Sequence, residues 1–439
     1  MRGARALVRS PAIWAFGLAA LVELALLIAW QRNGYWGFSG GVYADSSREL
    51  LHGLTPYRDF AAAQPPPVFL VGALLLAISD GPGALHVGLG LTDAATAGLV
   101  AYCVWRLERR AWLAIVAGLV APLLPITLNS HAQLIPETLA APLILAGAIG
   151  CASERHEGLG AALLAVAAWC KVAFLIPALA VAIAAPRARR TVGIVLGGFL
   201  LLYATSIAVF GTDVWRQTVV AQVQVGSAGL HYGGGLIAQI VWNELPLLFG
   251  AALLAESVRS QRRTGTGNAD RLIVTLAGAA AGGLLLALTV FKVGSYLNVM
   301  VVAEPPLLVL AVSGVARSWQ TLTKLRPLIV VAGALLAGQS ISLLVSPGNP
   351  GLAVRPFAGS GLAWTASPAS VGRAVAVARR CPAAVAYSGT PYIAFLARRR
   401  MPGNQPDLFM LANAREDANF AVQANHDEPR CPTLTNVGP

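Results

Sequence analysis

Long apolar segments recur along the first three quarters of this 439-residue chain. Many of them are close to the ~20 consecutive apolar residues that a helix needs to cross a bilayer. The chain is 56% hydrophobic, and the 12% of its residues that are charged are about half the fraction found in an average soluble protein. Its mean hydropathy is +0.64. These features predict an all-α polytopic membrane protein.

The basic residues lie mainly in short loops between the apolar segments. Lys and Arg favour the cytoplasmic side of a membrane, and one arrangement places all of the basic clusters there. These clusters are Arg2/Arg5/Arg9, Arg106/Arg109/Arg110, Arg187/Arg189/Arg190, Arg259/Arg262/Arg263 and Arg317/Lys324/Arg326. The arrangement has about eleven helices, near 12–30, 85–104, 112–128, 137–153, 159–170, 172–185, 191–210, 236–256, 272–290, 297–315 and 327–345. The first outer loop, 31–84, then lies outside.

Two segments admit a second interpretation. Residues 159–185 are predicted to form two short helices, because all later basic clusters then stay inside. A single tilted helix would reverse everything downstream. The apolar run 66–79 begins with three prolines at 65–67, which disfavour a continuous helix from the loop. We interpret it as a juxtamembrane or re-entrant helix, and a plain short transmembrane helix is the alternative.

The character of the chain changes after Val345. Residues 346–439 have few long apolar runs and many Pro, Arg, Asn and Asp. We expect a small outer domain of mixed α/β structure, with helices at 374–378 and 391–397 and a strand at 383–387. Cys381 and Cys431 would lie there in an oxidising space, so a disulfide between them is predicted, with two free thiols as the alternative.

Five charged residues gather in the first outer loop of a chain that has few charges. They are Asp45, Arg48, Glu49, Arg58 and Asp59. Charge placed beside a membrane indicates a site that faces water at the bilayer edge. The formal net charge of +12 does not indicate nucleic-acid binding, because the basic residues are dispersed among short loops. The chain contains no phosphate-binding Gly-rich loop, no Cys-x-x-Cys and no His-Glu-x-x-His motif, so neither a metal nor another cofactor is indicated.

This loop resembles that of a known family. An acidic residue follows the first helix, then come Gly53-Leu-Thr-Pro56-Tyr57-Arg58-Asp59-Phe60 and Gln64-Pro65-Pro66. The pattern is similar to the first outer loop of GT-C class glycosyltransferases, in the branch with protein O-mannosyltransferases and aminoarabinose transferases. Pro136-Glu137, Trp169-Cys-Lys171 and Lys292-Val-Gly-Ser-Tyr296 are similar to later family motifs in the same order. The resemblance covers about 1–345. Asp45 stands between Ala44 and Ser46, where many relatives have paired acidic residues.

The resemblance implies enzymes that take a sugar from a polyprenyl-phosphate lipid at the outer face of the membrane. Such a transfer needs a base for the acceptor hydroxyl and a cation for the departing phosphate. Asp45 is the predicted general base, and its alternative role is a helix N-cap. Glu137 is the second catalytic candidate, which would orient the acceptor, assist the base or hold a metal. Its alternative role is to favour the start of a helix.

The predicted cations and contacts also have two interpretations each. Lys171 and Lys292 would bind the lipid phosphate, or they would extend to the membrane interface. Arg58 would bind phosphate in a forked geometry, or it would form a local ion pair with Asp59. The predicted substrate contacts are Glu49, Asp59, His131 and Tyr296.

The sequence therefore predicts an inverting glycosyltransferase of the bacterial cell membrane. Its partners would be a polyprenyl-phosphate sugar, membrane lipids and a glycan, lipid or protein acceptor of the cell envelope. The alternative is a lipid-linked saccharide transporter that binds the same headgroup without chemistry. Ionisable residues lining a path through the membrane, or symmetric repeats, would favour transport.

Overall fold

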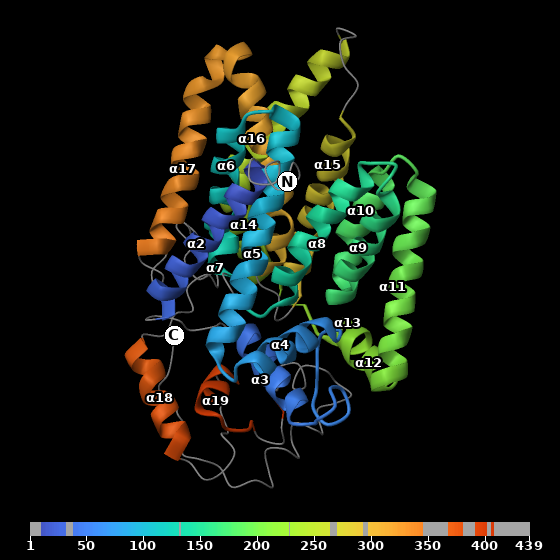
Figure 1. Ribbon diagram of the computed structural model, residues 1–439, viewed down its shortest axis with the longest axis vertical. Coiled ribbons are helices and arrows are strands. Elements are labelled where there is room, and N and C mark those ends of the chain that lie inside the picture. Colours follow the sequence, from blue (N-terminus) through green and yellow to red (C-terminus); the bar gives the residue numbers. More distant parts are fainter. Residues whose placement is uncertain are drawn as a thin grey trace, which may run out of the picture.

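The described part of the chain is built from helices in two layers (Figure 1). The computed structural model describes residues 10–31, 38–130, 133–227, 229–263, 270–292, 297–345, 368–380, 391–401 and 405–407. No strand occurs among these residues, apart from isolated bridges. The upper layer is a bundle of upright helices, and the lower layer contains shorter helices and the loop that joins them.

The bundle takes most of the chain. It contains α2 (Pro11–Gln31), α5 (Pro82–Glu108), α6 (Ala111–Val120), α7 (Pro125–Asn129), α8 (Pro136–Cys151), α9 (Glu157–Cys170), α10 (Leu175–Ala184), α11 (Ala188–Phe210), α14 (Gly229–Arg263), α15 (Arg271–Leu285), α16 (Glu304–Thr321) and α17 (Arg326–Val345). The lower layer contains α3 (Phe38–Leu51), α4 (Pro67–Ile78), α12 (Asp213–Trp215), α13 (Ala221–Gln224), α18 (Pro368–Arg380) and α19 (Pro391–Ala397).

Five helices of the bundle are long and apolar enough to cross a membrane. They run over Pro82–Glu108, Ala188–Phe210, Gly229–Gln261, Arg271–Phe291 and Thr323–Leu344. Shorter apolar helices account for most of the other predicted spans, including Pro136–Cys151 and Glu157–Cys170. The helical, membrane-embedded class is therefore confirmed, whereas the number of eleven spans stays a prediction.

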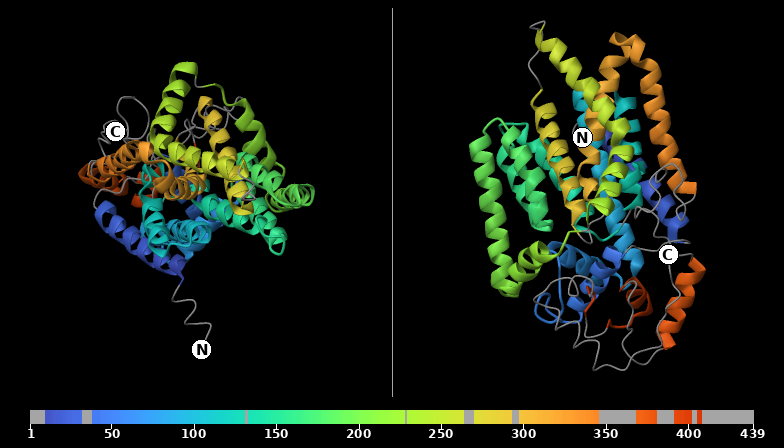
Figure 2. Two further views of the ribbon diagram at one scale, coloured as in Figure 1. Left: turned by 90° about the horizontal axis from the view of Figure 1, so that it is seen from above. Right: turned by 180° about the vertical axis from the view of Figure 1, so that it is seen from behind.

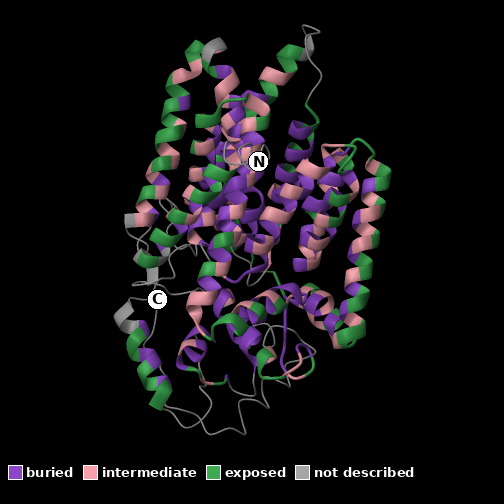
Figure 3. Cartoon of the chain, in the orientation of Figure 1, coloured by how far each residue is buried: buried purple, intermediate pink, exposed green. Residues whose placement is uncertain are grey.

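The outermost helices carry apolar side chains on their exposed surface. In Figure 3 the buried residues concentrate where bundle helices face one another, and exposed residues run along α11 and α17. Figure 2 places these two helices at opposite sides of the bundle. Leu201 of α11 is 68% exposed and Val331 of α17 is 62% exposed. An apolar surface of this kind suits lipid tails as its solvent.

Small residues allow the central helices to approach closely. A Cβ atom added at Gly314 of α16 would lie only 2.0 Å from the carbonyl oxygen of Gly250 in α14. Close backbone approach through glycine is the usual way in which helices associate inside a membrane. A polar contact fixes a neighbouring element: the Glu304 carboxylate accepts hydrogen bonds from the backbone N–H groups of Ile126, at 3.1 Å, and Thr127, at 2.7 Å.

The structure describes both segments for which the sequence left two interpretations. Residues 159–185 form two short helices, α9 and α10, separated by Lys171 in an extended conformation and by the short 3-10 helix Val172–Phe174. The prediction of two helices is thus confirmed. The run after the prolines forms the 12-residue α4, which begins at Pro67 and lies beside α3 in the lower layer.

The C-terminal region contributes two helices to the lower layer. The helices predicted near 374–378 and 391–397 are confirmed as α18 and α19. Val371, Ala374 and Val375 of α18 pack with Ile393 of α19 in a small apolar core. The strand predicted at 383–387 lies outside the described residues, so the mixed α/β character and the domain boundary at 345 stay predictions.

Candidate functional site

A carboxylate and a lysine meet at the lower end of the bundle. Glu137 lies in the first turn of α8, directly after Pro136, and its side chain is 1% exposed. Lys171 lies in the break between α9 and the following 3-10 helix, where the extended backbone interrupts the helix. Its Nζ atom donates to Oε1 of Glu137 at 2.7 Å. The Lys171 side chain remains 24% exposed and its cation lies 5.8 Å from the ring centre of Phe174.

A second lysine joins this pair. Lys292 directly follows the 3-10 helix Leu286–Phe291, which continues from α15. Its Nζ atom donates to Oε1 of Gln222. Gln222 in turn donates to the carbonyl of Ala63 in the first loop, at 3.1 Å. Burial, together with the positive charge of Lys171, lowers the pKa of Lys292 to about 8. We call Glu137, Lys171 and Lys292 the lysine cluster.

The lysine cluster carries an excess of positive charge. By formal charge it contains two ammonium groups, on Lys171 and Lys292, and one carboxylate, on Glu137. Oε2 of Glu137 is buried and accepts no hydrogen bond from the described residues. Two partly buried cations near one carboxylate can balance the charge of an additional anion.

Tyr43 connects the lysine cluster to α3. Burial and the nearby charges of Glu137 and Asp407 raise the pKa of the Tyr43 phenol well above its usual value. Its ring packs edge-on against Phe69 of α4, with centroids 5.8 Å apart. One face of α3 is therefore turned toward α4 and the start of α8.

Asp45 occupies a different face of α3. Successive residues of a helix turn by about 100°, so Asp45 points roughly 200° away from Tyr43. Its carboxylate is fully buried and pairs with the guanidinium of Arg48, one turn later. Burial raises the pKa of Asp45 to about 7, against the effect of Arg48 and with a contribution from Glu49. The structure thus pairs Glu137 with Lys171, places Lys292 within electrostatic reach of Lys171, and turns Asp45 toward another face of α3.

Arg48 attaches α3 to the C-terminal region. Its guanidinium donates to the backbone carbonyls of Phe395, at 2.9 Å, and Arg399, at 2.7 Å. Gly41 makes this approach possible, because a Cβ atom there would lie 2.6 Å from the backbone nitrogen of Tyr392. The face of α3 that carries Asp45 is consequently covered by α19.

Glu49 shares the buried environment of Asp45. It is 1% exposed, and neither of its carboxylate oxygens accepts a hydrogen bond from the described residues. Glu49 lies four residues after Asp45 and so on the same face of α3, and its charge contributes to the raised pKa of Asp45. Its predicted contact with substrate stays a prediction.

Arg58 and Asp59 form a local ion pair. Nε of Arg58 lies 3.0 Å from Oδ1 of Asp59, and the Arg58 side chain is 69% exposed. Asp59 also accepts from the backbone N–H of Thr55 at 2.7 Å, so it closes the turn of the loop. The hydrogen bond from Arg58 lowers the pKa of Asp59 below its usual value. This is the geometry expected of the alternative interpretation, in which the pair holds the shape of the loop.

The remaining predicted residues cannot be placed. His131, Tyr296, Cys381 and Cys431 lie outside the described residues, so their predicted contacts and disulfide stay predictions. Within the described ranges, no group of three or more His, Cys, Asp or Glu side chains is arranged to hold a metal ion.

Three residues that interact with the predicted site residues were not predicted from the sequence. Gln222 has no local motif that marks it, and its role follows only from the fold. Tyr43 lies within the charged loop, where an aromatic residue two positions before Asp45 was the available signal. Phe395 accepts from Arg48 across more than three hundred residues of sequence, a contact that no spacing rule predicts.

The fold resembles that of a protein of known structure. No family model matches the chain, and none of the curated proteins matches it. Among solved structures, the crystal structure of ArnT from Cupriavidus metallidurans bound to undecaprenyl phosphate superposes with a TM-score of 0.61. The match covers 96% of this chain and 89% of that chain, at 16% sequence identity. The fold expected from the resemblance to GT-C glycosyltransferases is therefore confirmed.

Proposed function

We propose that this protein is a membrane glycosyltransferase that uses a polyprenyl-phosphate-linked sugar as donor. The observation that carries the proposal is the lysine cluster, a partly buried site with more positive than negative charge. The fold of the chain resembles that of a protein whose crystal structure contains undecaprenyl phosphate. A lipid phosphate is an anion that reaches such a site from the membrane, where soluble phosphate compounds are scarce.

The lysine cluster supports a simple role for each cation. When the donor binds, its phosphate competes with Glu137 for Lys171, and Lys292 supplies a second donor to the phosphate oxygens. The acceptor oxygen then attacks the anomeric carbon, and the bond from that carbon to the phosphate oxygen breaks. The bonding electron pair leaves with the phosphate, whose added negative charge both lysines stabilise.

A carboxylate must take the proton of the acceptor hydroxyl. The sequence favours Asp45, whereas the arrangement of α3 favours Glu137, because Glu137 pairs with Lys171 and Asp45 lies under α19. We propose Glu137 as the base. The donor phosphate would draw Lys171 away from Glu137, and the Glu137 carboxylate would then be free to accept the proton. Attack from the side opposite the phosphate would invert the anomeric centre.

The site would face the outside of a bacterial cell membrane, where a polyprenyl-phosphate donor would meet an envelope acceptor. The lysine cluster lies at the end of the bundle that meets the lower layer, and the distribution of basic loops supports an outward position for this end. The acceptor would be a glycan, lipid or protein with a free hydroxyl group. The proposed reaction uses no metal, because the two lysines supply the charge that a metal would otherwise supply.

The proposal is tested with purified protein in liposomes and a radiolabelled polyprenyl-phosphate sugar. Lys171→Ala and Lys292→Ala should each weaken donor binding at least about tenfold, as expected for a charge-assisted hydrogen bond. Lys→Arg at either position should restore part of the binding. Lys324→Ala is the control, because this lysine lies in the 3-10 helix Thr323–Leu325 between α16 and α17, at the end of the bundle opposite the lysine cluster (Figure 1).

Two results would contradict the proposal. Wild-type donor affinity in both alanine variants would assign the lysines to folding or anchoring. Headgroup movement across the bilayer without any glycosylated product would favour the lipid-linked saccharide transporter. Glu137→Gln should bind the donor but lose transfer by a factor of at least about a hundred, the lower range for a general base. Full transfer by Glu137→Gln would exclude it as the base.

A further inference from the structure

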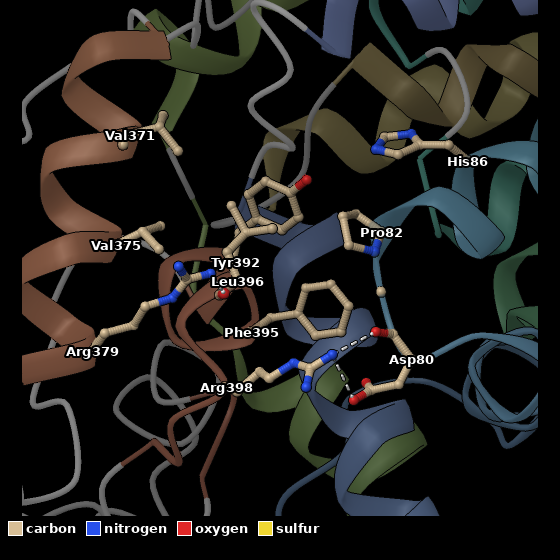
Figure 4. Close-up of a pocket in the computed structure, with 12 residues that line it drawn as sticks. Asp80, Pro82, His86, Val371, Val375, Arg379, Tyr392, Phe395, Leu396 and Arg398 are labelled. Carbon is tan, nitrogen blue, oxygen red and sulfur yellow. Dashed lines mark hydrogen bonds and ion pairs between the residues drawn. The ribbon is translucent and has the colours of Figure 1, made fainter.

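A cleft lies in the lower layer, beside α19. It has a volume of about 540 Å³, within the range of small-molecule sites. Its walls come from the start of α5, from α18 and from α19 with the residues that follow it (Figure 4). The lysine cluster contributes no residue to it.

The cleft has a cationic rim. Arg379 of α18 and Arg398, just after α19, both line it and both are exposed. Arg398 forms an ion pair with Asp80, with Nη2 and Oδ2 3.2 Å apart, and Figure 4 shows this pair at the edge. Asp80 is the sole acidic residue among the described lining residues. Arg373 and Arg380 add further exposed positive charge to α18.

The floor of the cleft is apolar. Val371 and Val375 of α18 face Phe395 and Leu396 of α19 across it, and Pro82 closes the side toward α5. A site with guanidinium groups at the rim and an apolar floor matches a ligand that has an anionic group and an apolar portion. A fully hydrated anion such as free phosphate would gain nothing from the floor.

The position of the cleft relative to α5 indicates where such a ligand comes from. The 27-residue α5 is about 40 Å long at 1.5 Å per residue. This length exceeds the ~30 Å hydrocarbon core of a bilayer, so one end of α5 extends into the headgroup region. Pro82 begins α5 and lines the cleft. A cationic rim at the start of a helix longer than the hydrocarbon core suits the lipid phosphates of the headgroup region, and basic pockets beside membrane helices are suited to lipid headgroups.

We propose that this cleft binds the headgroup phosphate of an anionic membrane lipid, with Arg379 and Arg398 as its ligands. The site is separate from the donor site proposed above and does not depend on glycosyl transfer. Its wall is connected to α3, because Phe395 lines the cleft and its carbonyl oxygen accepts from Arg48 at 2.9 Å.

The test is native mass spectrometry of the full chain in a neutral detergent, titrated with phosphatidylglycerol. We expect one tightly retained lipid, and phosphatidylcholine should bind at least about tenfold more weakly. Arg379→Gln combined with Arg398→Gln should weaken phosphatidylglycerol binding at least about tenfold. Arg216→Gln is the matched control, since Arg216 is also exposed and paired with a neighbouring aspartate, Asp213, but lies near α12.

A variant that is expected to bind lipid more tightly complements the arginine variants, because misfolding would weaken binding and not strengthen it. Asp80→Asn removes the carboxylate that competes for Arg398, so this variant should bind phosphatidylglycerol more tightly than the wild type. Unchanged or weaker binding by Asp80→Asn would overturn the assignment of Arg398. Equal retention of phosphatidylglycerol and phosphatidylcholine would overturn the requirement for an anion. Equal affinity for glycerol 3-phosphate would assign the site to a soluble phosphate compound instead of a lipid.

Discussion

Replacement of Asp45 by Asn separates the energetic cost of this carboxylate from its use in chemistry. Asp45 is fully buried, and burial raises its pKa to about 7, although Arg48 lies beside it. An unfolded chain has an Asp pKa of about 3.9. The folded protein therefore binds this proton more tightly than the unfolded chain over the pH range between the two values.

The sign of the effect follows from this difference. Because the folded state holds more protons, the free energy of unfolding decreases as the pH rises from about 4 to about 7. The difference between a pKa of about 7 and the ordinary value of 3.8 corresponds to roughly 4 kcal/mol at ~1.36 kcal/mol for each pH unit. Asp45→Asn has no proton to lose. Above pH 7 it should therefore be more stable than the wild type, by up to about 4 kcal/mol.

The assay is thermal unfolding of detergent-solubilised protein between pH 5 and pH 8. The midpoint of the wild type should fall across this range relative to Asp45→Asn. Asp59→Asn is the matched control, because the pKa of Asp59 is lowered and its titration lies below the range tested. Parallel curves for the wild type and Asp45→Asn would refute the reasoning, since they would mean that Asp45 stays charged in the folded protein.

Transfer activity of the same variant decides between the two carboxylates. If Glu137 is the base, Asp45→Asn should retain transfer to within about tenfold, with Arg48 still bound to the carbonyls of Phe395 and Arg399. A loss of about a hundredfold or more, in a variant that remains folded and binds the donor, would restore Asp45 to the role that the sequence predicts.

Three further predictions concern packing and topology. Gly41→Ala should destabilise the contact between α3 and α19 by about 1–3 kcal/mol, because the new methyl group meets the α19 backbone, and limited proteolysis should then cleave the C-terminal region faster. Glu304→Gln should lower the unfolding midpoint, because an amide replaces a carboxylate that holds two backbone N–H groups of α7, a loss of about 1–3 kcal/mol. In intact cells an impermeant maleimide should label Arg58→Cys but not Arg187→Cys, and the reverse pattern would invert the topology.

The sequence was sufficient to predict helix positions in most of the bundle. Hydropathy locates α5, α11 and α15 because each presents a long apolar run, and the break at Lys171 marks the boundary between α9 and α10. The sequence predicted that α14 begins near residue 236, whereas the helix begins at Gly229. Gly233 falls before the predicted helix 236–256 but lies inside α14, where a Cβ atom would meet the ring of Phe291 at 2.2 Å. A glycine that permits close packing and a glycine that permits a turn look the same in a sequence.

The site was only partly predictable for a related reason. Local motifs identified Glu137, Lys171 and Lys292, and the fold brings them together. The resemblance also predicted Asp45 as a residue of this site. The orientation of a side chain, however, depends on which helix face meets which neighbour. That information lies in contacts between distant segments, such as the one from Arg48 to Phe395.

The two faces of α3 explain why so many charges gather in one short segment. Tyr43 on one face is influenced by Glu137, whereas Arg48 on another is held by the backbone of α19. A helix is rigid over this distance, so a displacement of α19 that moves Arg48 must also move Tyr43. The burial of Asp45 without full compensation costs stability. A segment that served only to join two helices would have no reason to retain that cost, whereas a segment that fixes the C-terminal region to the part of the bundle that carries Glu137 requires such contacts on both faces.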